Sequence, residues 1–360
     1  MYKCIHSVKS IRYSLRHITY QASMPQVPCA SMSIHKGWRE MLQQAALQFG
    51  LEPNDYFPDE TSSERIRIRP ADLRAFSTRF NQLCQDSGEP LFPAFAAKHV
   101  SPLTFSCYSL ALWTGNDLNT FIQDACQYCI LIGSPIRLKH HITPKGNSEL
   151  WVINHDPFND KSKVSDHGFM MYVATLIEMI QQSTGGVDKL ILKITRWPFP
   201  QLLQPQFEQL MGCQIKTGSP ILKICFPSNA REIRLKGRDP NIYSVTIPPL
   251  RQAVSQLESH DIILLIYKLL DNEPNLKDIS REKIAAEMLM SVRTLNRRLA
   301  VLGSSYRQVL EQYKLEKALL LISQPNINLT DIAFRLGFAD LSSFSRAFKG
   351  WTGHSPTHFL

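Results

Sequence analysis

The chain has 360 residues, 44% of them hydrophobic and 20% charged, a composition that excludes an intrinsically disordered protein and, at this length, predicts two domains. Lys and Arg outnumber Asp and Glu by 40 to 31, and the net charge of +9 favours a polyanionic partner, although many basic proteins bind no nucleic acid. Eight cysteines without framework spacing indicate reduced thiols in a cytoplasmic protein, and no apolar run approaches the length that spans a bilayer, so no membrane insertion is expected.

The first residues, 1–35, form a basic extension. They contain four Lys or Arg and no acid, and the absence of a continuous apolar run argues against a signal peptide. Two alternatives stay open here: the extension is disordered, or translation starts at Met24 or Met32.

Residues 36–257 alternate between helical and strand patterns. Helical spacing runs through 37–49, from Pro70, through 103–113, from an Asp117 cap to 131, through 168–182 and through 207–211. Strand patterns cover 136–142, 149–154, 190–195 and 221–226, and Pro144 to Asn147 has the composition of a hairpin turn. Helices first and strands later predict an α+β domain with a mixed sheet. The methionine-rich stretch 169–180 suits core packing, a ligand pocket or a dimer face.

The boundary to the second domain is expected between 257 and 258. Pro248 and Pro249 should interrupt the chain before a helix over 250–257, because proline lacks the amide that a helix interior needs. The next apolar helix, 261–270, belongs with the second domain, 258–360, which is expected to be all-α.

That C-terminal domain contains an internal repeat. A pattern over 284–299 returns over 332–348 with one extra residue in the turn, so that Ile284 matches Ile332, Ala285 matches Ala333 and Leu295 matches Phe344. Each copy has a short Ile-Ala helix, a turn, a polar cap (Ser291 or Asp340) and an amphipathic helix. The repeat predicts two helix-turn-helix units.

The outward faces of the second helices carry residue types that contact DNA. Arginine can bridge guanine O6 and N7, and asparagine can pair with adenine. The predicted base contacts are Arg293, Asn296 and Arg297 in the first copy and Ser342, Ser343 and Arg346 in the second. The predicted phosphate contacts are Ser291, Thr294, Arg298 and Lys349.

The second copy also resembles the AraC/XylS-type transcription regulators. The matching residues are Asp331-Ile332-Ala333, Gly337-Phe338, Ser343 to Lys349, Gly353 and Ser355-Pro356. The resemblance implies two subdomains joined by a long helix over 306–323, with both recognition helices in successive major grooves of double-stranded DNA. It further implies RNA polymerase as a partner and favours activation over repression, with a homodimer as an additional option.

The N-terminal half resembles the arabinose-binding-type regulatory domain found in one branch of that family. The matching features are Pro102-Leu103, Asp117-Leu118, Asp156-Pro157, 207–213 and Ile224 to Pro227. This resemblance implies control by a small effector or a partner, without identifying arabinose or any other effector.

The sequence contains few signals of a catalytic or metal-binding site. Cys126 and Cys129 have metal-ligand spacing and His140-His141 are near, but the cysteines lie in an apolar helical pattern and adjacent strand residues point to opposite faces. Motifs for nucleotide binding, zinc proteases and serine hydrolases are absent from the sequence. We therefore expect no enzyme, no cofactor and no metal.

Two rival functions use the same DNA-binding module. A DNA-alkylation repair protein would need an activated cysteine in a Pro-Cys-His-Arg context, whereas Pro28-Cys29-Ala30-Ser31 lacks the His and the Arg. A DNA-architectural protein would bind without effector control.

Overall fold

The computed structural model describes residues 33–57, 65–67, 70–133, 136–153, 164–260, 262–301, 304–324 and 327–359. Residues 1–32, which make up most of the predicted extension, lie outside these ranges. The last three residues of that extension, however, form the edge strand β1 (Ser33–His35), which pairs antiparallel with β2 (Arg65–Arg67). The three residues at the end of the predicted extension are therefore part of a small antiparallel sheet.

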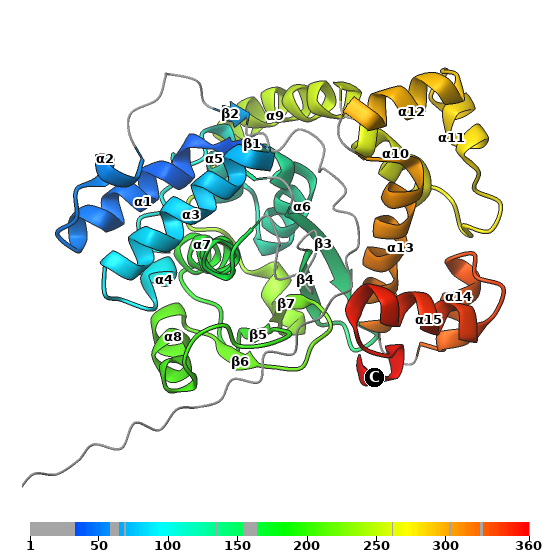
Figure 1. The fold of residues 1–360 in the computed structure, drawn as a ribbon. Coiled ribbons are helices and arrows are strands. Elements are labelled where there is room, and N and C mark those ends of the chain that lie inside the picture. The colour runs from blue at the N-terminus through cyan, green and yellow to red at the C-terminus, as the bar shows by residue number, and fades with distance from the viewer. Residues whose placement is uncertain are drawn as a thin grey trace, which may run out of the picture.

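Helices make up the first part of the fold (Figure 1). Local capping explains several of their starts: Asp117 accepts a hydrogen bond from the Thr120 amide, as predicted, and Ser165 does the same for Gly168. The helices are α1 (Lys36–Gln48), α2 (Pro53–Tyr56), α3 (Pro70–Asp86), α4 (Phe92–Ala97), α5 (Cys107–Thr114), α6 (Leu118–Tyr128), α7 (Asp166–Thr184) and α8 (Gln204–Met211), with short 3₁₀ turns η1 (Cys129–Leu131), η2 (Gln201–Leu203) and η3 (Ser228–Glu232).

A five-stranded sheet in the order β3-β4-β7-β5-β6 is built from strands that come after α6, with α7 and α8 between them in the chain. Its strands are β3 (Arg137–Ile142), β4 (Ser148–Ile153), β5 (Ile191–Lys193), β6 (Gln214–Lys216) and β7 (Leu222–Phe226). The pair β5 and β6 is parallel and the other pairs are antiparallel, so the predicted mixed sheet is confirmed. The predicted hairpin joins β3 to β4, and Gly146 takes the positive φ of 79° that its turn requires.

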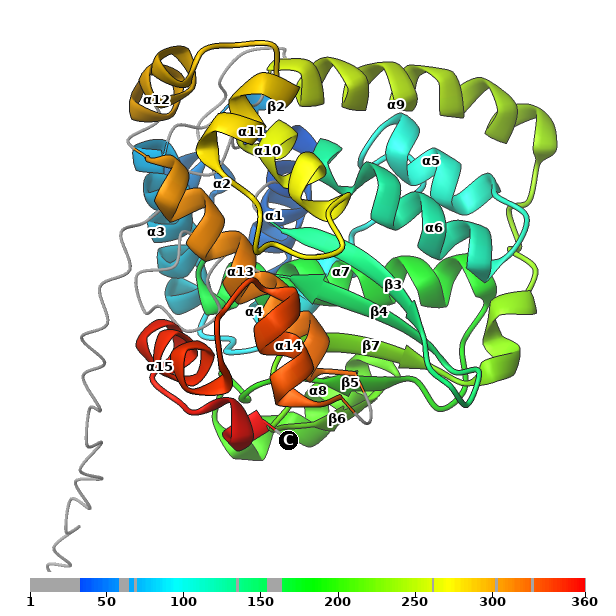
Figure 2. The same cartoon turned by 90° about the vertical axis from the view of Figure 1, so that its right-hand side faces the viewer.

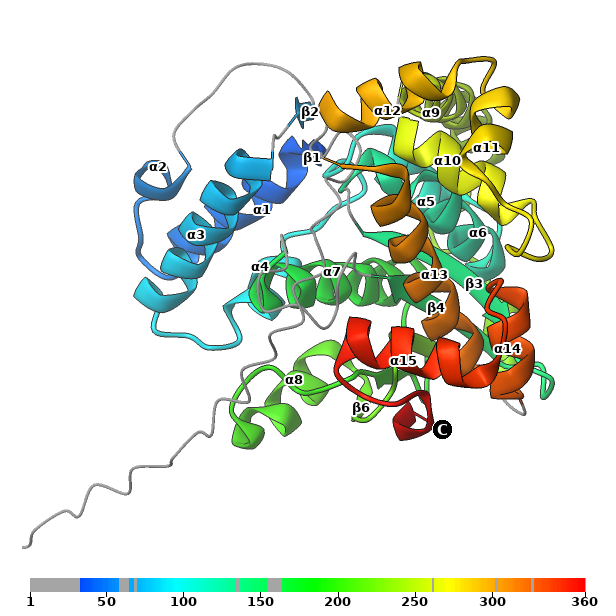
Figure 3. The ribbon, with the colours of Figure 1, turned by 45° about the vertical axis from the view of Figure 1, so that its right-hand side comes forward.

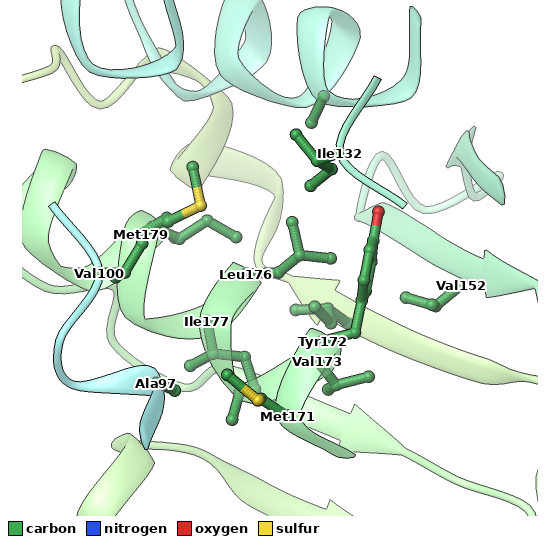
Figure 4. Close-up of a cluster of buried hydrophobic side chains, with 14 of the residues drawn as sticks. Ala97, Val100, Ile132, Val152, Met171, Tyr172, Val173, Leu176, Ile177 and Met179 are labelled. Carbon is green, nitrogen blue, oxygen red and sulfur yellow. The ribbon is translucent and has the colours of Figure 1, made fainter. Parts of the chain in front are cut away.

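One face of the sheet packs on α7. Leu150, Val152 and Ile224 of the sheet share a core with Val173 and Ile177 of the helix. Met171, Leu176 and Met179 of α7 are buried in the same core (Figure 4). The methionine-rich helix is therefore a core helix, the first of the three roles left open by its sequence.

The long helix α9 (Pro240–His260) corrects the prediction of a break at Pro248-Pro249. Both prolines are exposed inside the continuous helix, so their rings lie on its solvent side. Their neighbours Ile247 and Leu250 are buried in the first core, and burial of such side chains contributes roughly 1.5–3 kcal/mol each, comparable to the cost of about 3 kcal/mol of an interior proline. Tertiary packing thus keeps the helix together.

The C-terminal part is all-helical, as predicted. It comprises α10 (Ile262–Asp271), α11 (Arg281–Glu287), α12 (Val292–Val301), α13 (Tyr306–Ile322), α14 (Leu329–Arg335), α15 (Leu341–Thr352) and η4 (Pro356–Phe359). A second core joins these helices, and it also includes Trp151, Ile153 and Ile221 from the other face of the sheet. The sheet is consequently covered by α7 on one face and by α10 and α13 on the other (Figures 1 and 3). No helix in the described ranges is long and apolar enough to cross a membrane.

Candidate nucleic-acid interface

The two predicted helix-turn-helix units are α11–α12 and α14–α15. Ser291 Oγ accepts from the Thr294 amide at 3.2 Å at the start of α12, and Asp340 accepts from the Ser343 amide at 2.6 Å at the start of α15. In α15 the Asp340 amide also donates to Ser343 Oγ, which completes a capping box. Both caps satisfy amides that the helix itself leaves unpaired.

The apolar positions of the repeat form the interior of both units. Ile284, Ala285, Leu295 and Leu299 are buried in the first unit. Their counterparts in the second unit are equally buried: Ile332, Ala333, Phe344 and Phe348. The paired alanines leave room for the second helix to cross close to the first, so the internal repeat in the sequence is a repeat of packing.

The turn of the second unit connects it to the first. Gly337 has φ 73°, and a Cβ at this position would lie 2.7 Å from backbone atoms of Leu276 and Lys277, in the loop that precedes α11. The Leu276 amide donates to the Arg335 carbonyl at 3.0 Å in the same contact. A glycine is required here because a neighbouring backbone approaches closely, and this contact helps to set the spacing between the two recognition helices.

The corresponding position of the first unit is Leu289. It takes φ 52°, a left-handed conformation that is costly for a branched side chain, and its side chain is 95% exposed. The exposure of this side chain shows that the first turn has room for a leucine where the second turn has room only for glycine.

The predicted DNA-contacting side chains lie on the surface. Arg293, Asn296, Arg297 and Arg298 are exposed on α12, and Ser342, Arg346 and Lys349 are exposed on α15. Figures 2 and 3 place α12 and α15 near opposite ends of α13 and on the same side of it, with α11 and α14 on the other side. The structure therefore brings the arginine-bearing helices of both units to one side of the molecule.

Three predicted contact residues have local roles as well. The Ser343 hydroxyl donates to the Asp340 carbonyl and accepts from the Asp340 amide, so it is part of the capping box and only partly exposed. Ser291 and Thr294 place their hydroxyls 3.0 Å apart at the start of α12. The hydrogen bonds from Ser343 also hold the pKa of Asp340 below its usual value.

A second set of charged residues, which the sequence did not single out, joins the sheet to the C-terminal helices. Arg137 of β3 forms an ion pair with Glu316 of α13, and its guanidinium lies 4.4 Å from the ring centroid of Tyr267. Lys139 Nζ lies 3.6 Å from the Asp271 carboxylate at the end of α10. These partners are separated by more than a hundred residues, and no local pattern marks them.

The end of α13 meets the sheet in the same way. Lys223 Nζ of β7 donates to the carbonyl of Ser323, the C-cap of α13, at 2.9 Å. An ammonium group at this place also complements the negative end of the helix dipole. A basic sheet face thus meets two carboxylates and one helix C-terminus, and we call the residues Arg137, Lys139, Lys223, Asp271, Glu316 and Ser323 the junction.

Burial and neighbouring charges shift the pKa values of the ionisable groups in the junction. Burial lowers the pKa of Lys139 and of Lys223. Burial alone would raise the pKa of Asp271, but Lys139, the Tyr313 hydroxyl at 2.8 Å and Lys317 together hold it below its usual value. The acid therefore stays ionised inside the junction.

The cysteine and histidine residues weighed as ligands do not converge. His140 Nε2 lies 2.6 Å from Ser148 Oγ, whereas the His141 ring packs on Trp151 on the other face of the sheet. Burial raises the pKa of Cys126 and of Cys129, which makes both thiols poor ligands and nucleophiles. Within the described ranges no group of three or more His, Cys, Asp or Glu could hold a metal ion.

Comparisons with known proteins agree with this geometry. Residues 284–360 match the family model described as a helix-turn-helix domain. The ornithine utilization regulator of Pseudomonas aeruginosa is 24% identical over 89% of this chain and 94% of its own length. The HTH-type transcriptional regulator VqsM of the same organism is 39% identical over 21% of this chain and 23% of its own length.

Among solved structures, the transcriptional regulator CdpR of Pseudomonas aeruginosa superposes with a TM-score of 0.44 at 17% identity, covering 88% of this chain and 96% of that one. The matched family model covers the two units that carry the exposed arginines. The chain is thus a transcription regulator with an AraC-type helix-turn-helix DNA-binding domain at its C-terminal end.

Proposed function

We propose that this regulator recognises specific sites in double-stranded DNA by placing α12 and α15 in successive major grooves. Arg293, Asn296 and Arg297, and on the second helix Ser342, Ser343 and Arg346, are proposed to contact bases. Ser291, Thr294, Arg298 and Lys349 are proposed to contact phosphates. The observation that carries this assignment is that both helices with exposed arginines, α12 and α15, lie on one side of α13.

The capping geometry refines the proposal for α15. Because the Ser343 hydroxyl already bonds to the Asp340 backbone, base recognition by this helix should depend more on Arg346. Sequence specificity is then expected to be stronger in the half-site bound by α12, which offers two arginines and an asparagine.

We further propose that residues 36–257 form the regulatory part and residues 258–360 the DNA-binding part. Leu257 belongs to the first core and Ile262 to the second, which supports a boundary near the end of α9. Effector binding or a partner would act on DNA binding through the junction. We propose that this control activates transcription through contact with RNA polymerase and that the protein acts as a homodimer.

The effector itself is proposed to be a small amino acid or a related amine. The support is a relative that matches 89% of this chain, the ornithine utilization regulator, whose name refers to the use of a diamino acid.

The rival repair function needs a reactive cysteine. Burial raises the pKa of Cys84, Cys126, Cys213 and Cys225, which keeps these thiols protonated and unreactive. Incubation with methylated DNA followed by mass spectrometry would reveal a transferred methyl group on the protein if repair were its function.

The test of the DNA-binding proposal is selection of sites from a random DNA library by the full chain, followed by titration of variants. Arg297→Ala should weaken binding to the selected site by roughly 1–3 kcal/mol and relax one base position, because a bidentate base contact is lost. Arg238→Ala, which removes an exposed arginine in the regulatory part, serves as the control and should leave both quantities unchanged. Equal weakening of Arg297→Ala on selected and random DNA would reassign Arg297 to phosphate contact.

A further inference from the structure

A cavity lies beside the junction, between the regulatory sheet and the helix that joins the two recognition units. Its volume is about 80 Å³, and it opens in part to solvent. Its walls come from both parts of the chain: β4 and β7 contribute Val152 and Leu222, α7 contributes Phe169, and α13 contributes Leu319 and Glu316. A molecule bound here would touch the regulatory part and α13 at once.

The polar groups of this cavity carry charges of both signs. Asp166, in the first turn of α7, and Arg196, in the segment after β5, form an ion pair at 3.1 Å. Their side chains remain 54% and 68% exposed, so both retain hydrogen-bonding capacity for a ligand. Glu316 adds a second carboxylate from the opposite wall, while the remainder of the lining is mostly apolar.

From this arrangement we infer that the cavity is the effector site and that it binds a small diamino acid. The Arg196 guanidinium suits a carboxylate, which it can bind with two parallel hydrogen bonds. Asp166 suits the neighbouring α-ammonium group, the apolar walls suit a short methylene chain, and Glu316 suits a second ammonium at the far end of that chain. The inference rests on the proposed effector control and assigns it a location and a ligand chemistry.

The position of Glu316 provides the coupling to DNA binding. Its carboxylate is buried and pairs with Arg137, so it contributes to the docking of α13 on the sheet. A ligand ammonium at Glu316 competes with Arg137 for the same carboxylate. The ligand consequently has different affinities for the protein with α13 docked on the sheet and with α13 undocked. Such a difference in affinity is required for a ligand to shift the equilibrium between two states. Because α13 carries one recognition unit at each end, a change in its docking would move α12 and α15 together relative to the regulatory part.

The experiment uses the full chain and titrates L-ornithine and L-lysine by calorimetry into the wild type, Arg196→Gln and Asp166→Asn. Both substitutions are at exposed positions, and circular dichroism will verify that the variants are folded. Each should reduce affinity for the amino acid roughly ten- to hundredfold through loss of a charge-assisted hydrogen bond. Arg238→Gln, an exposed arginine outside the cavity lining, is the matched control and should bind as the wild type does.

A second measurement addresses coupling. Saturating amino acid should change the affinity of the wild type for its selected DNA site about fivefold or more, and DNA should change the affinity for the amino acid by the same factor. Glu316→Gln should abolish most of this mutual effect while Arg196 and Asp166 still hold the α-amino acid group.

The outcomes separate the two proposals. A wild-type protein that selects no DNA sequence would overturn the proposed function. A protein that selects a DNA site but binds neither amino acid, or binds them equally well after Arg196→Gln and Asp166→Asn, would overturn the effector-site inference alone. Binding that depends on both residues and leaves DNA affinity unchanged would contradict the role of Glu316.

Discussion

Single backbone positions distinguish the two turns of the DNA-binding domain. Gly337 and Leu289 occupy equivalent places in the repeat and both have positive φ. A Cβ at Gly337 would clash with the backbone of Leu276 and Lys277, whereas the Leu289 side chain is exposed to solvent. The same φ therefore has opposite consequences for substitution at the two sites.

We predict that Gly337→Ala destabilises the protein by more than about 2 kcal/mol, because it combines left-handed strain with a clash against backbone that has little freedom to move. DNA affinity should fall as well, since this contact links the two units. Chemical denaturation and DNA titration measure the two effects.

Leu289→Gly is the matched substitution in the first unit, and it should raise stability by up to about 1 kcal/mol because the strain is relieved without loss of a packed side chain. A loss of stability on denaturation would show that the exposed leucine makes a contact that matters in solution.

Elements determine how the side chains of α15 are presented. The capping box of Asp340 and Ser343 starts α15 at Leu341, three residues before the core residue Phe344. It thereby sets the direction of the helix face that carries Arg346. The hydrogen bonds between Asp340 and Ser343 therefore orient Arg346, the residue predicted to contact DNA.

Replacing Asp340 with Ala should therefore lower the melting temperature and weaken DNA binding together, because the Ser343 amide at the start of α15 loses its side-chain partner. Ser342→Ala, at the adjacent exposed position outside the cap, should leave the melting temperature unchanged.

The hydrogen bonds also depress the pKa of Asp340, so the contribution of the cap to stability is present above the unfolded-state pKa and is lost as pH falls through the folded-state pKa. Melting curves recorded between neutral and acidic pH measure this loss, which Asp340→Asn should reduce.

The whole molecule is organised around a sheet with two differently covered faces. The face toward α7 is apolar, and the face toward α10 and α13 mixes aliphatic residues with the charges of the junction. An interface that relies on ion pairs is easier to open than an apolar one, because water and salt compete for its partners.

The pKa of Asp271 predicts how acid acts on this interface. Lys139, Lys317, Arg137 and the Tyr313 hydroxyl face its carboxylate and lower its pKa in the folded state. The stabilisation is therefore complete above the unfolded-state pKa and disappears as pH falls through the folded-state pKa. We expect hydrogen exchange of α10 and α13 to accelerate on acidification, and Asp271→Asn to show faster exchange already at neutral pH with a smaller dependence on pH. An unchanged dependence in the variant would assign the acid sensitivity to another group.

Prediction from the sequence succeeded where the cause of structure is local. The caps at Asp117, Ser291 and Asp340, the hairpin around Gly146 and the paired apolar positions of the repeat depend on residues a few positions apart. It failed where packing decides. Helix α9 continues through Pro248 and Pro249 because its neighbours are buried, and the three-residue strand β6 and the short helices α2 and α4 exist because other elements hold them.

The sequence by itself determined the DNA-reading half of this protein: two repeated helix-turn-helix units, their caps and the polar side chains on their outer faces. Periodicity and capping are short-range properties, and they are visible along the chain. Only the tertiary structure decided that α12 and α15 lie on one side of α13, that Gly337 touches the loop before α11, and that Arg137, Lys139 and Lys223 meet the C-terminal helices. Those contacts join residues up to about two hundred positions apart, and no local pattern specifies which distant charge or backbone a side chain will meet.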